Sequence, residues 1–280
     1  MTATSPLQQR CDQLVVTMAR HVAGHPVAVQ GLNTPLATAA LLLAKCLHAP
    51  DVLLLYTDGG VVDDQPRALT APGSPPEAAS DPLRDLPFAE LICELVPAYH
   101  PLEFMRPAQL DRLGNANSLW IDLEDRRLAL PGPAGMCDAS SENRNLAYYL
   151  PRHDSRALVA QVDVIATPGR SVSDADVGGL PQVPNSVFTE LCVLGLGPDG
   201  FYIDSLYPGV VVDEVAARTG FALAPTGDVQ ARVPPPARDE LEALSEIDPR
   251  RLRDLEMLGT RDRVAALRAI DDKGALHVDG

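Results

Sequence analysis

Two short apolar segments on either side of an almost wholly apolar helix most constrain what this chain can fold into. Val27–Gln30 and Val52–Tyr56 have the length and composition of buried strands. Between them, Thr34 suits the cap of a helix and Pro35 its first position, and Pro35–Leu47 is apolar on nearly every side. Strand, helix and strand in this order predict a parallel βαβ unit, and therefore an α/β fold.

The rest of the chain alternates short periodic segments with proline-rich breaks. The patterns predict helices over residues 7–22, 86–95 and 211–219, and strands over residues 118–122, 127–130, 157–166, 188–194 and 201–205. Residues 61–87 are polar and proline-rich, which indicates a long loop. We therefore expect an open, mostly parallel sheet flanked by helices over residues 1–232. A C-terminal helical extension is expected over residues 233–280.

The charge of the chain restricts its partners. Its 280 residues include 23 Lys and Arg against 38 Asp and Glu, a net charge of −15. Nucleic acids and anionic membranes would repel such a chain, so neither is expected to bind it. The most apolar stretch, Pro35–Tyr56, contains charged residues and a proline and is not a membrane span. The five cysteines have no paired spacing and their number is odd, which favours the reducing cytoplasm over a disulfide framework.

Two patterns that often mark cofactor sites have simpler explanations here. Gly195, Gly197 and Gly200 match the glycine spacing of dinucleotide-binding loops, but a strand and not a helix follows them. Because the pyrophosphate needs the N-terminus of a helix, these glycines with Pro198 and Asp199 predict a β-hairpin turn. The six histidines have no metal-ligand spacing. We therefore expect neither a cofactor nor a metal ion.

Polar residues gather in two places that suit ligand binding. Thr57-Asp58-Gly59-Gly60 follows the carboxyl end of an apolar strand, the edge at which open α/β sheets bind ligands. Asp58 is a candidate base or nucleophile there, while a turn or a helix cap would explain it equally well. The segment 109–117 places amides and a carboxylate around Gly114. It forms either a turn or a polar cradle for a carboxylate or a thioester carbonyl.

Several of these segments together resemble the β subunit of family I CoA-transferases, of the glutaconate CoA-transferase type. The resemblance rests on residues 31–37, 48–59, 108–117 and 247–254, and the Gln-x-Asp-x-x-Gly-Asn-x-Asn pattern is its most specific part. Within the family, the chain is most similar to the β subunits of the ring-cleaving hydrolases of steroid catabolism. The resemblance implies the α/β fold of the CoA-transferase (NagB/RpiA-like) superfamily. It also implies an acyl-CoA site shared with an α-type subunit, in a heterodimer or heterotetramer.

The resemblance further implies roles for particular residues. Transferases of this family carry a nucleophilic glutamate at the strand end, and that position falls on Thr57 or Asp58 here. A threonine hydroxyl needs an activating base, and an aspartate is one methylene shorter than a glutamate. Thr57 and Asp58 are therefore the candidate catalytic residues. The candidate substrate-binding residues are Asn33, Gly59, Gln109, Asn115, Gly135 and Met136.

The absence of the family glutamate favours C–C bond cleavage over CoA transfer among the activities that this family implies. We expect a two-subunit enzyme that hydrolyses a C–C bond of an acyl-CoA or decarboxylates it, with coenzyme A present only as part of the substrate. Two alternatives stay open: a CoA-transferase that uses Asp58, and a non-catalytic scaffold or regulatory paralogue. Ser141-Glu142-Asn143 spells the nucleophile motif of the succinyl-CoA type but stands too late in the chain. It is interpreted as a polar loop.

Overall fold

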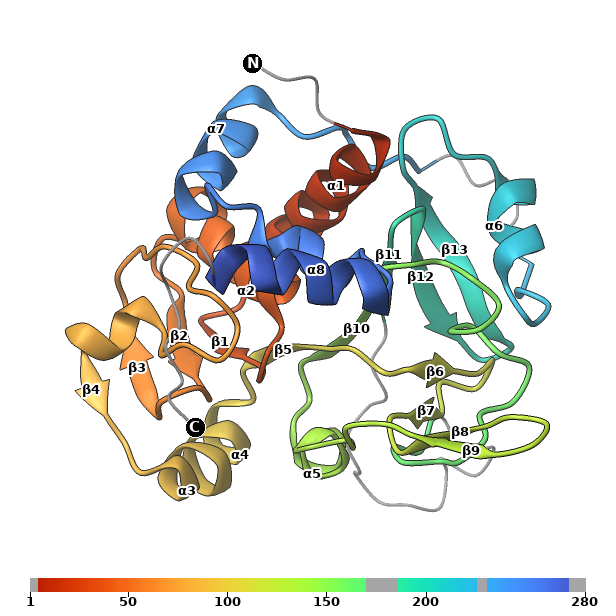
Figure 1. Cartoon of the computed structure of the whole chain (residues 1–280), viewed down its shortest axis with the longest axis horizontal. Helices are drawn as coiled ribbons and strands as arrows, with labels where there is room; N and C mark the ends of the chain where they lie inside the picture. The colour runs from red at the N-terminus through yellow and green to blue at the C-terminus, as the bar shows by residue number, and fades with distance from the viewer. Residues whose placement is uncertain (1–4, 170–185, 226–230, 272–280) are drawn as a thin grey trace. The chain divides into compact units, whose positions relative to one another are not determined.

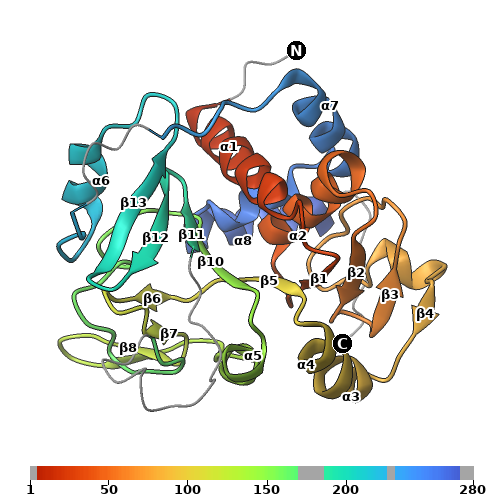
Figure 2. The same ribbon diagram turned by 180° about the vertical axis from the view of Figure 1, so that it is seen from behind.

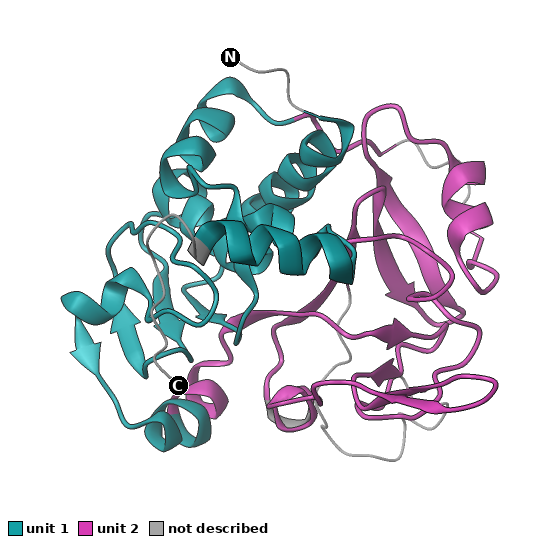
Figure 3. Cartoon of the chain, in the orientation of Figure 1, with its two compact units in different colours: residues 1–94, 236–280 teal, residues 95–235 magenta. Residues whose placement is uncertain are grey.

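The computed structural model describes residues 5–169, 186–225 and 231–271. It divides the chain into two units (Figure 3), of which unit 1 comprises residues 1–94 and 236–280 and unit 2 comprises residues 95–235. Each unit has strands and helices of its own (Figures 1 and 2). Unit 1 is therefore built from both ends of the chain, and unit 2 from one continuous segment.

The strands of unit 1 are built around the predicted βαβ unit. They are β1 (Val27–Gln30), β2 (Leu53–Tyr56), β3 (Val61–Asp63) and β4 (Arg84–Asp85). β1 and β2 are parallel and pair Gln30 with Tyr56, whereas β3 and β4 add antiparallel beyond β2. The prediction of a long loop over residues 61–87 is therefore wrong. The turn into β3 requires glycine at position 60 for two reasons. Its φ of +67° is rarely adopted by other residues, and a Cβ there would collide with the carbonyl oxygen of Leu86.

An apolar helix forms the core of unit 1. The helical segments of this unit are α1 (Pro6–His21), α2 (Pro35–Leu43), η1 (Ala44–His48), η2 (Glu77–Ser80), α3 (Phe88–Glu90), α7 (Arg238–Ile247), η4 (Leu252–Glu256) and α8 (Thr260–Asp271). All nine residues of α2 are buried, and α2 packs against α1, α7 and η4. The Glu256 carboxylate accepts a 2.9 Å hydrogen bond from the Leu36 amide, one of the unpaired donors at the start of α2. The predicted helices over residues 7–22 and 35–47 are confirmed, although the second ends as the π-helix η1.

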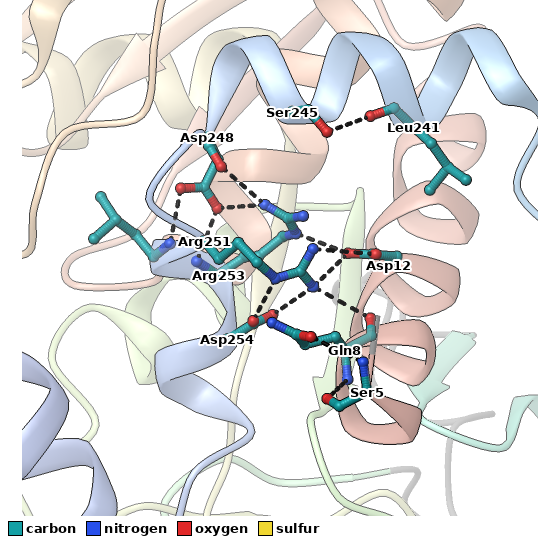
Figure 4. Close-up of polar contacts among 10 residues, drawn as sticks. Ser5, Gln8, Asp12, Leu241, Ser245, Asp248, Arg251, Arg253 and Asp254 are labelled. Carbon is teal, nitrogen blue, oxygen red and sulfur yellow. Dashed lines mark hydrogen bonds and ion pairs between the residues drawn. The ribbon is translucent and has the colours of Figure 1, made fainter. Parts of the chain in front are cut away.

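A buried ionic cluster joins α1 to the C-terminal segment of unit 1 (Figure 4). The Arg253 side chain is 1% exposed and donates to Asp12 on α1 at 2.9 Å and to Asp248 at 2.7 Å. Arg251 also bonds to Asp12, and to Asp254. Each guanidinium thus meets two carboxylates, which offsets the cost of removing these charges from water. Residues 247–254, which are part of the family resemblance, therefore stabilise unit 1 by joining its C-terminal segment to α1.

The strands of unit 2 form one mixed sheet and two small hairpins. The main sheet contains, in order, β5 (Leu102–Met105), β10 (Leu146–Leu150), β11 (Ser186–Thr189), β12 (Cys192–Gly197) and β13 (Gly200–Leu206). The hairpins are β6 (Gln109–Leu110) with β7 (Ala116–Asn117), and β8 (Trp120–Asp122) with β9 (Arg127–Ala129). The first three main strands are parallel and the last two antiparallel. The helices are α4 (Val96–Tyr99), α5 (Met136–Glu142) and α6 (Val212–Arg218), and η3 (Leu91–Leu95) spans the boundary of the two units in sequence.

The hairpin predicted for unit 2 is confirmed, and two of its predicted strands are wrong. Residues 188–194 do not form one strand, because they contain the end of β11, a turn and the start of the antiparallel strand β12. Gly197 pairs with Gly200 across Pro198 and Asp199, which confirms the hairpin turn. The predicted strand over residues 157–166 does not form, since only an isolated bridge of Leu158 interrupts irregular backbone there. In both units parallel strands form the core of the sheet and antiparallel strands extend it, with helices alongside, as the predicted α/β class requires. No helix in the described ranges is long and apolar enough to cross a membrane.

Candidate functional site

A pocket in unit 1 lies at the carboxyl ends of β1 and β2. Its walls come from these strands, from the first turns of α2 and from residues 67–77, which connect β3 to η2. The polar groups that line it include Gln30, Thr38, Tyr56, Asp58, Arg67 and Glu77. The strand edge that the sequence associates with ligand binding therefore coincides with a hollow.

Asp58 enters this pocket from the turn after β2 and is held by the neighbouring strand. Its Oδ2 accepts a 2.9 Å hydrogen bond from Nε2 of Gln30, the last residue of β1. Among the described residues, no donor reaches the other oxygen, Oδ1. Asp58 lies in the turn of the β2–β3 hairpin and does not precede a helix, so the explanation of Asp58 as a helix cap is wrong. The geometry leaves a half-buried carboxylate that lines the pocket, with one oxygen fixed and the other without a donor among the described residues.

Thr57 and Gly59 flank Asp58 and shape the turn. The Thr57 hydroxyl donates to the backbone carbonyl of Gln30 at 2.7 Å. A carbonyl oxygen cannot act as the base that would activate this hydroxyl as a nucleophile. Gly59 has φ +100°, a conformation that favours glycine. Asn33 lies between β1 and α2 and also lines the pocket. Four of the predicted site residues are thus near one another in unit 1.

Two buried polar atoms of the pocket have no hydrogen-bond partner in the described part of the chain. They are Oε1 of Gln30 and the hydroxyl oxygen of Tyr56. Burial raises the pKa of Tyr56 well above its ordinary value, and the nearby Asp63 carboxylate adds to this effect. The Tyr56 hydroxyl therefore keeps its proton and is available as a donor.

The other predicted site residues belong to unit 2, where their polar groups have partners within the chain. The buried Gln109 amide donates to Asp163 at 2.9 Å and accepts from Asn117 at 2.7 Å. Asn115 donates to Asp111 at 2.9 Å and accepts from the Gly169 amide at 2.7 Å. These bonds order the β6–β7 hairpin and the segment beside it. The substrate contacts assigned to Gln109 and Asn115 stay a prediction.

The glycine-containing loop before α5 supplies the last two candidates. Gly135 is the N-cap of α5, and Met136 is its first residue and 7% exposed. The Ser118 hydroxyl lies 3.9 Å from the Met136 sulfur. Ser141 and Glu142 are the last two residues of α5 and Asn143 is its C-cap, so the interpretation of Ser141-Glu142-Asn143 as a polar loop is wrong. The side chains of Ser141 and Glu142 lie outside the described residues. The roles of Gly135 and Met136 therefore also stay predictions.

Three residues of the pocket are not predicted from the sequence. The pattern assigns Gln30 only to a strand, although an amide at the end of an otherwise apolar strand is a recognisable signal. Tyr56 likewise reads as part of the apolar strand. Arg67 falls in the predicted loop, but its guanidinium bonds Asp63 on β3 at 2.7 Å and the carbonyl of Asp81. Its position depends on β3, which the sequence does not predict.

The chemistry available at this site is that of a positioned carboxylate with polar neighbours. Within residues 5–169, 186–225 and 231–271, no group of three or more His, Cys, Asp or Glu side chains is arranged to hold a metal ion. Asp58 can accept a proton or orient a polar group, and the Tyr56 hydroxyl supplies a donor to the same pocket.

Comparison with known proteins identifies the family. No family model matches the chain. The chain is 30% identical over 241 residues to the cholesterol ring-cleaving hydrolase IpdB subunit of Rhodococcus jostii, covering 81% of this chain and 88% of that protein. It is 27% identical over 246 residues to a subunit of the 3-oxoadipate CoA-transferase of Pseudomonas knackmussii, covering 85% of this chain and 93% of that protein.

Solved structures agree on the fold. The decarboxylase AibA/AibB superposes with a TM-score of 0.74 at 24% identity, covering 88% of this chain and 97% of the other. Glutaconate coenzyme A-transferase from Acidaminococcus fermentans gives a TM-score of 0.71 at 22% identity, covering 85% and 94%. The chain therefore belongs to the CoA-transferase family, as a relative of its β-type subunits. This confirms the family resemblance drawn from the sequence.

Proposed function

We propose that this chain is the β-type subunit of a two-subunit enzyme that cleaves a C–C bond of an acyl-CoA by hydrolysis or decarboxylation. The observation that carries the proposal is the Asp58 carboxylate, which lines the pocket and is fixed at one oxygen by Gln30, while the other oxygen has no donor among the described residues. Such a carboxylate suits proton transfer and orientation of a reactant. The relatives include a ring-cleaving hydrolase subunit and a decarboxylase, which supports both reactions.

The bond from Gln30 argues against covalent catalysis by Asp58. A nucleophilic carboxylate must move its oxygen onto the thioester carbonyl, and misplacement by about 1 Å can cost roughly a hundredfold in rate. Asp58 is short and is tied at Oδ2 to the end of a buried strand. In the proposed scheme the thioester stays intact, and coenzyme A is required only as part of the substrate.

The partner in this proposal is an α-type subunit of the same family. Both sequence relatives are themselves subunits of an enzyme, and structural neighbours carry the paired names AibA/AibB and IpdAB. We place the complex in the cytoplasm, since all five cysteines lie within the described residues and are thiols. The α-type subunit would supply further catalytic groups and much of the contact with coenzyme A.

CoA transfer through Asp58 is the second candidate, and the similarity to a 3-oxoadipate CoA-transferase subunit favours it. One experiment separates the two. The purified complex of this chain with its α-type subunit is incubated with acetoacetyl-CoA, quenched with acid and examined by mass spectrometry. We expect acetyl-CoA and acetate, with no mass added to this chain. An aspartyl-CoA thioester at Asp58 would establish the transferase instead, and absence of any acyl-CoA binding would indicate a scaffold.

A further inference from the structure

The two unpartnered atoms of the pocket lie on the same face of the sheet. Gln30 and Tyr56 are register partners on the parallel strands β1 and β2, so their side chains project to one side. Gln30 is 7% exposed and Tyr56 is 3% exposed, and both line the pocket. Other buried polar atoms also lack a protein partner, among them the Tyr148 hydroxyl, but within the described residues only these two line the pocket.

The donor and acceptor roles of the two atoms are fixed by their surroundings. An ionised carboxylate only accepts hydrogen bonds, so the NH₂ end of Gln30 must face Asp58 and its oxygen must face away. The Tyr56 hydroxyl keeps its proton because it is buried. The site therefore presents one acceptor and one donor, and the same amide that offers the acceptor also touches the candidate catalytic carboxylate.

Neighbouring polar groups do not satisfy these atoms. The Thr38 hydroxyl donates to the carbonyl of Thr34 at 2.9 Å. The Arg67 guanidinium is directed to Asp63 and to the carbonyl of Asp81. Buried polar groups in native proteins are nearly always paired, and a water molecule is the usual partner where protein atoms supply none.

We propose that Gln30 and Tyr56 hold a water molecule beside Asp58 and that this water is the hydrolytic nucleophile. The water accepts a hydrogen bond from the Tyr56 hydroxyl, donates one hydrogen to Gln30 Oε1 and turns its other hydrogen toward Asp58 Oδ1. The inference rests on the proposed function and selects hydrolysis over decarboxylation, which consumes no water. Gln30 and Tyr56 are positioning residues in this scheme.

The reaction balances without another reactant. Asp58 takes a proton from the water, whose oxygen forms a bond to the ketone carbon of a 3-oxoacyl-CoA. The adduct then breaks its C–C bond, and the electron pair of that bond passes to the carbon next to the thioester. The proton held by Asp58 is delivered to this carbon. The products are a carboxylic acid and a shortened acyl-CoA, which together contain the atoms of substrate and water.

The test combines crystallography with kinetics on the complex of this chain and its α-type subunit. In a crystal structure that resolves ordered waters, we expect one within hydrogen-bond distance of both Gln30 Oε1 and the Tyr56 hydroxyl. Tyr56→Phe keeps the ring and removes the donor, so that water is expected to disappear. Tyr148→Phe is the matched control, since it removes a buried hydroxyl of unit 2 that likewise has no partner among the described residues and does not line the pocket.

With acetoacetyl-CoA as the probe, Tyr56→Phe is expected to lower kcat about 10- to 100-fold while KM changes less than about twofold. Tyr148→Phe is expected to match the wild type in both constants. The absence of the water from wild-type crystals, or full activity of Tyr56→Phe, overturns the inference even if C–C cleavage occurs. If acetoacetyl-CoA is not cleaved, the crystal structures alone decide the water site, whereas an aspartyl-CoA adduct defeats the proposed function itself.

Discussion

Gln30 Nε2 and Asp58 Oδ2 are joined by a 2.9 Å hydrogen bond that links the carboxyl ends of two parallel strands. The two residues are 28 positions apart in the sequence, and the βαβ connection brings them back side by side. The bond gives the short Asp58 side chain a fixed direction before any ligand arrives. A reactive carboxylate that is already oriented loses little conformational freedom when substrate binds.

Asp58→Asn tests the role of this carboxylate. The amide keeps the size of the side chain but cannot take up a proton, so we expect the rate of C–C cleavage to fall by about 10²–10⁴ while substrate still binds. Steady-state kinetics of the reconstituted complex, with binding measured by calorimetry, checks this. Asp64→Asn is the control, because Asp64 is an exposed carboxylate outside the pocket lining. Nearly full activity of Asp58→Asn would show that Asp58 only stabilises the turn and has no catalytic role.

Thr57→Val separates a structural hydroxyl from a nucleophile. The hydroxyl is bonded to the Gln30 carbonyl at 2.7 Å, and valine keeps the branched shape without the bond. We expect a loss of about 1 kcal/mol in the free energy of unfolding, and activity within roughly tenfold of the wild type. Urea unfolding and the same kinetic assay measure the two effects. A Thr57→Val protein that is stable but has no turnover would show that Thr57, and not Asp58, is the catalytic residue.

Arg253→Met tests the buried cluster of unit 1. The substitution leaves Asp12 and Asp248 buried without the guanidinium that they share, so the free energy of unfolding is expected to fall by about 3–5 kcal/mol. Denaturant unfolding followed by circular dichroism provides the measurement. Arg238→Met is the control, since Arg238 is 91% exposed and its pair with Glu242 lies on the surface of α7. Equal stability of the two variants would contradict the structural role of Arg253.

His153 predicts a pH dependence of stability. Its ring is buried in unit 2 and lies 3.0 Å from the Thr189 hydroxyl and 2.9 Å from the Thr219 hydroxyl. Burial, aided by the positive charge of Arg218, lowers the pKa of His153 to about 4 from an ordinary value of 6.5. Between these values the unfolded chain binds the proton more readily than the folded chain.

The contribution of neutral His153 to the free energy of unfolding is therefore complete above about pH 6.5, and it is lost as the pH falls toward 4. The total change is roughly 3 kcal/mol. Urea unfolding at a series of pH values, for the wild type and for His153→Gln, gives the difference in slope that belongs to this residue. Other histidines contribute equally to both proteins and cancel. Identical slopes for the two proteins would show that His153 does not titrate in this range.

The sequence is informative where one short segment decides the structure. The glycine and proline content of residues 195–200 predicts the β12–β13 hairpin, because turn geometry depends on local backbone preferences. The βαβ unit is equally local, since the apolar helix and its two strands are consecutive. Asp58 is predictable for the same reason: it follows the second strand at the edge where such sheets bind ligands.

Features set by distant contacts are not predictable in this way. Residues 157–166 contain enough apolar side chains for a strand, yet only Leu158 and Val162 are buried among them. The patterns miss the buried strands β3, β5 and β10, and the sheet partners of β10 come from distant parts of the chain. The surroundings of Arg67 and Tyr56 depend in the same way on how β3 folds back. Pairing of this kind depends on long-range packing, which overrides local preference.

The division of unit 1 between the two ends of the chain determines when this unit can be completed during synthesis. Asp12 leaves the ribosome 241 residues before Arg253, the cation that neutralises it in the folded state. Glu256, whose carboxylate accepts the hydrogen bond from the Leu36 amide at the start of α2, is synthesised 220 residues after Leu36. Residues 95–235 are finished first and form a continuous unit. The nascent chain therefore carries the fully apolar α2 without its C-terminal cover until translation is almost over, and it is in this interval that it most needs a chaperone.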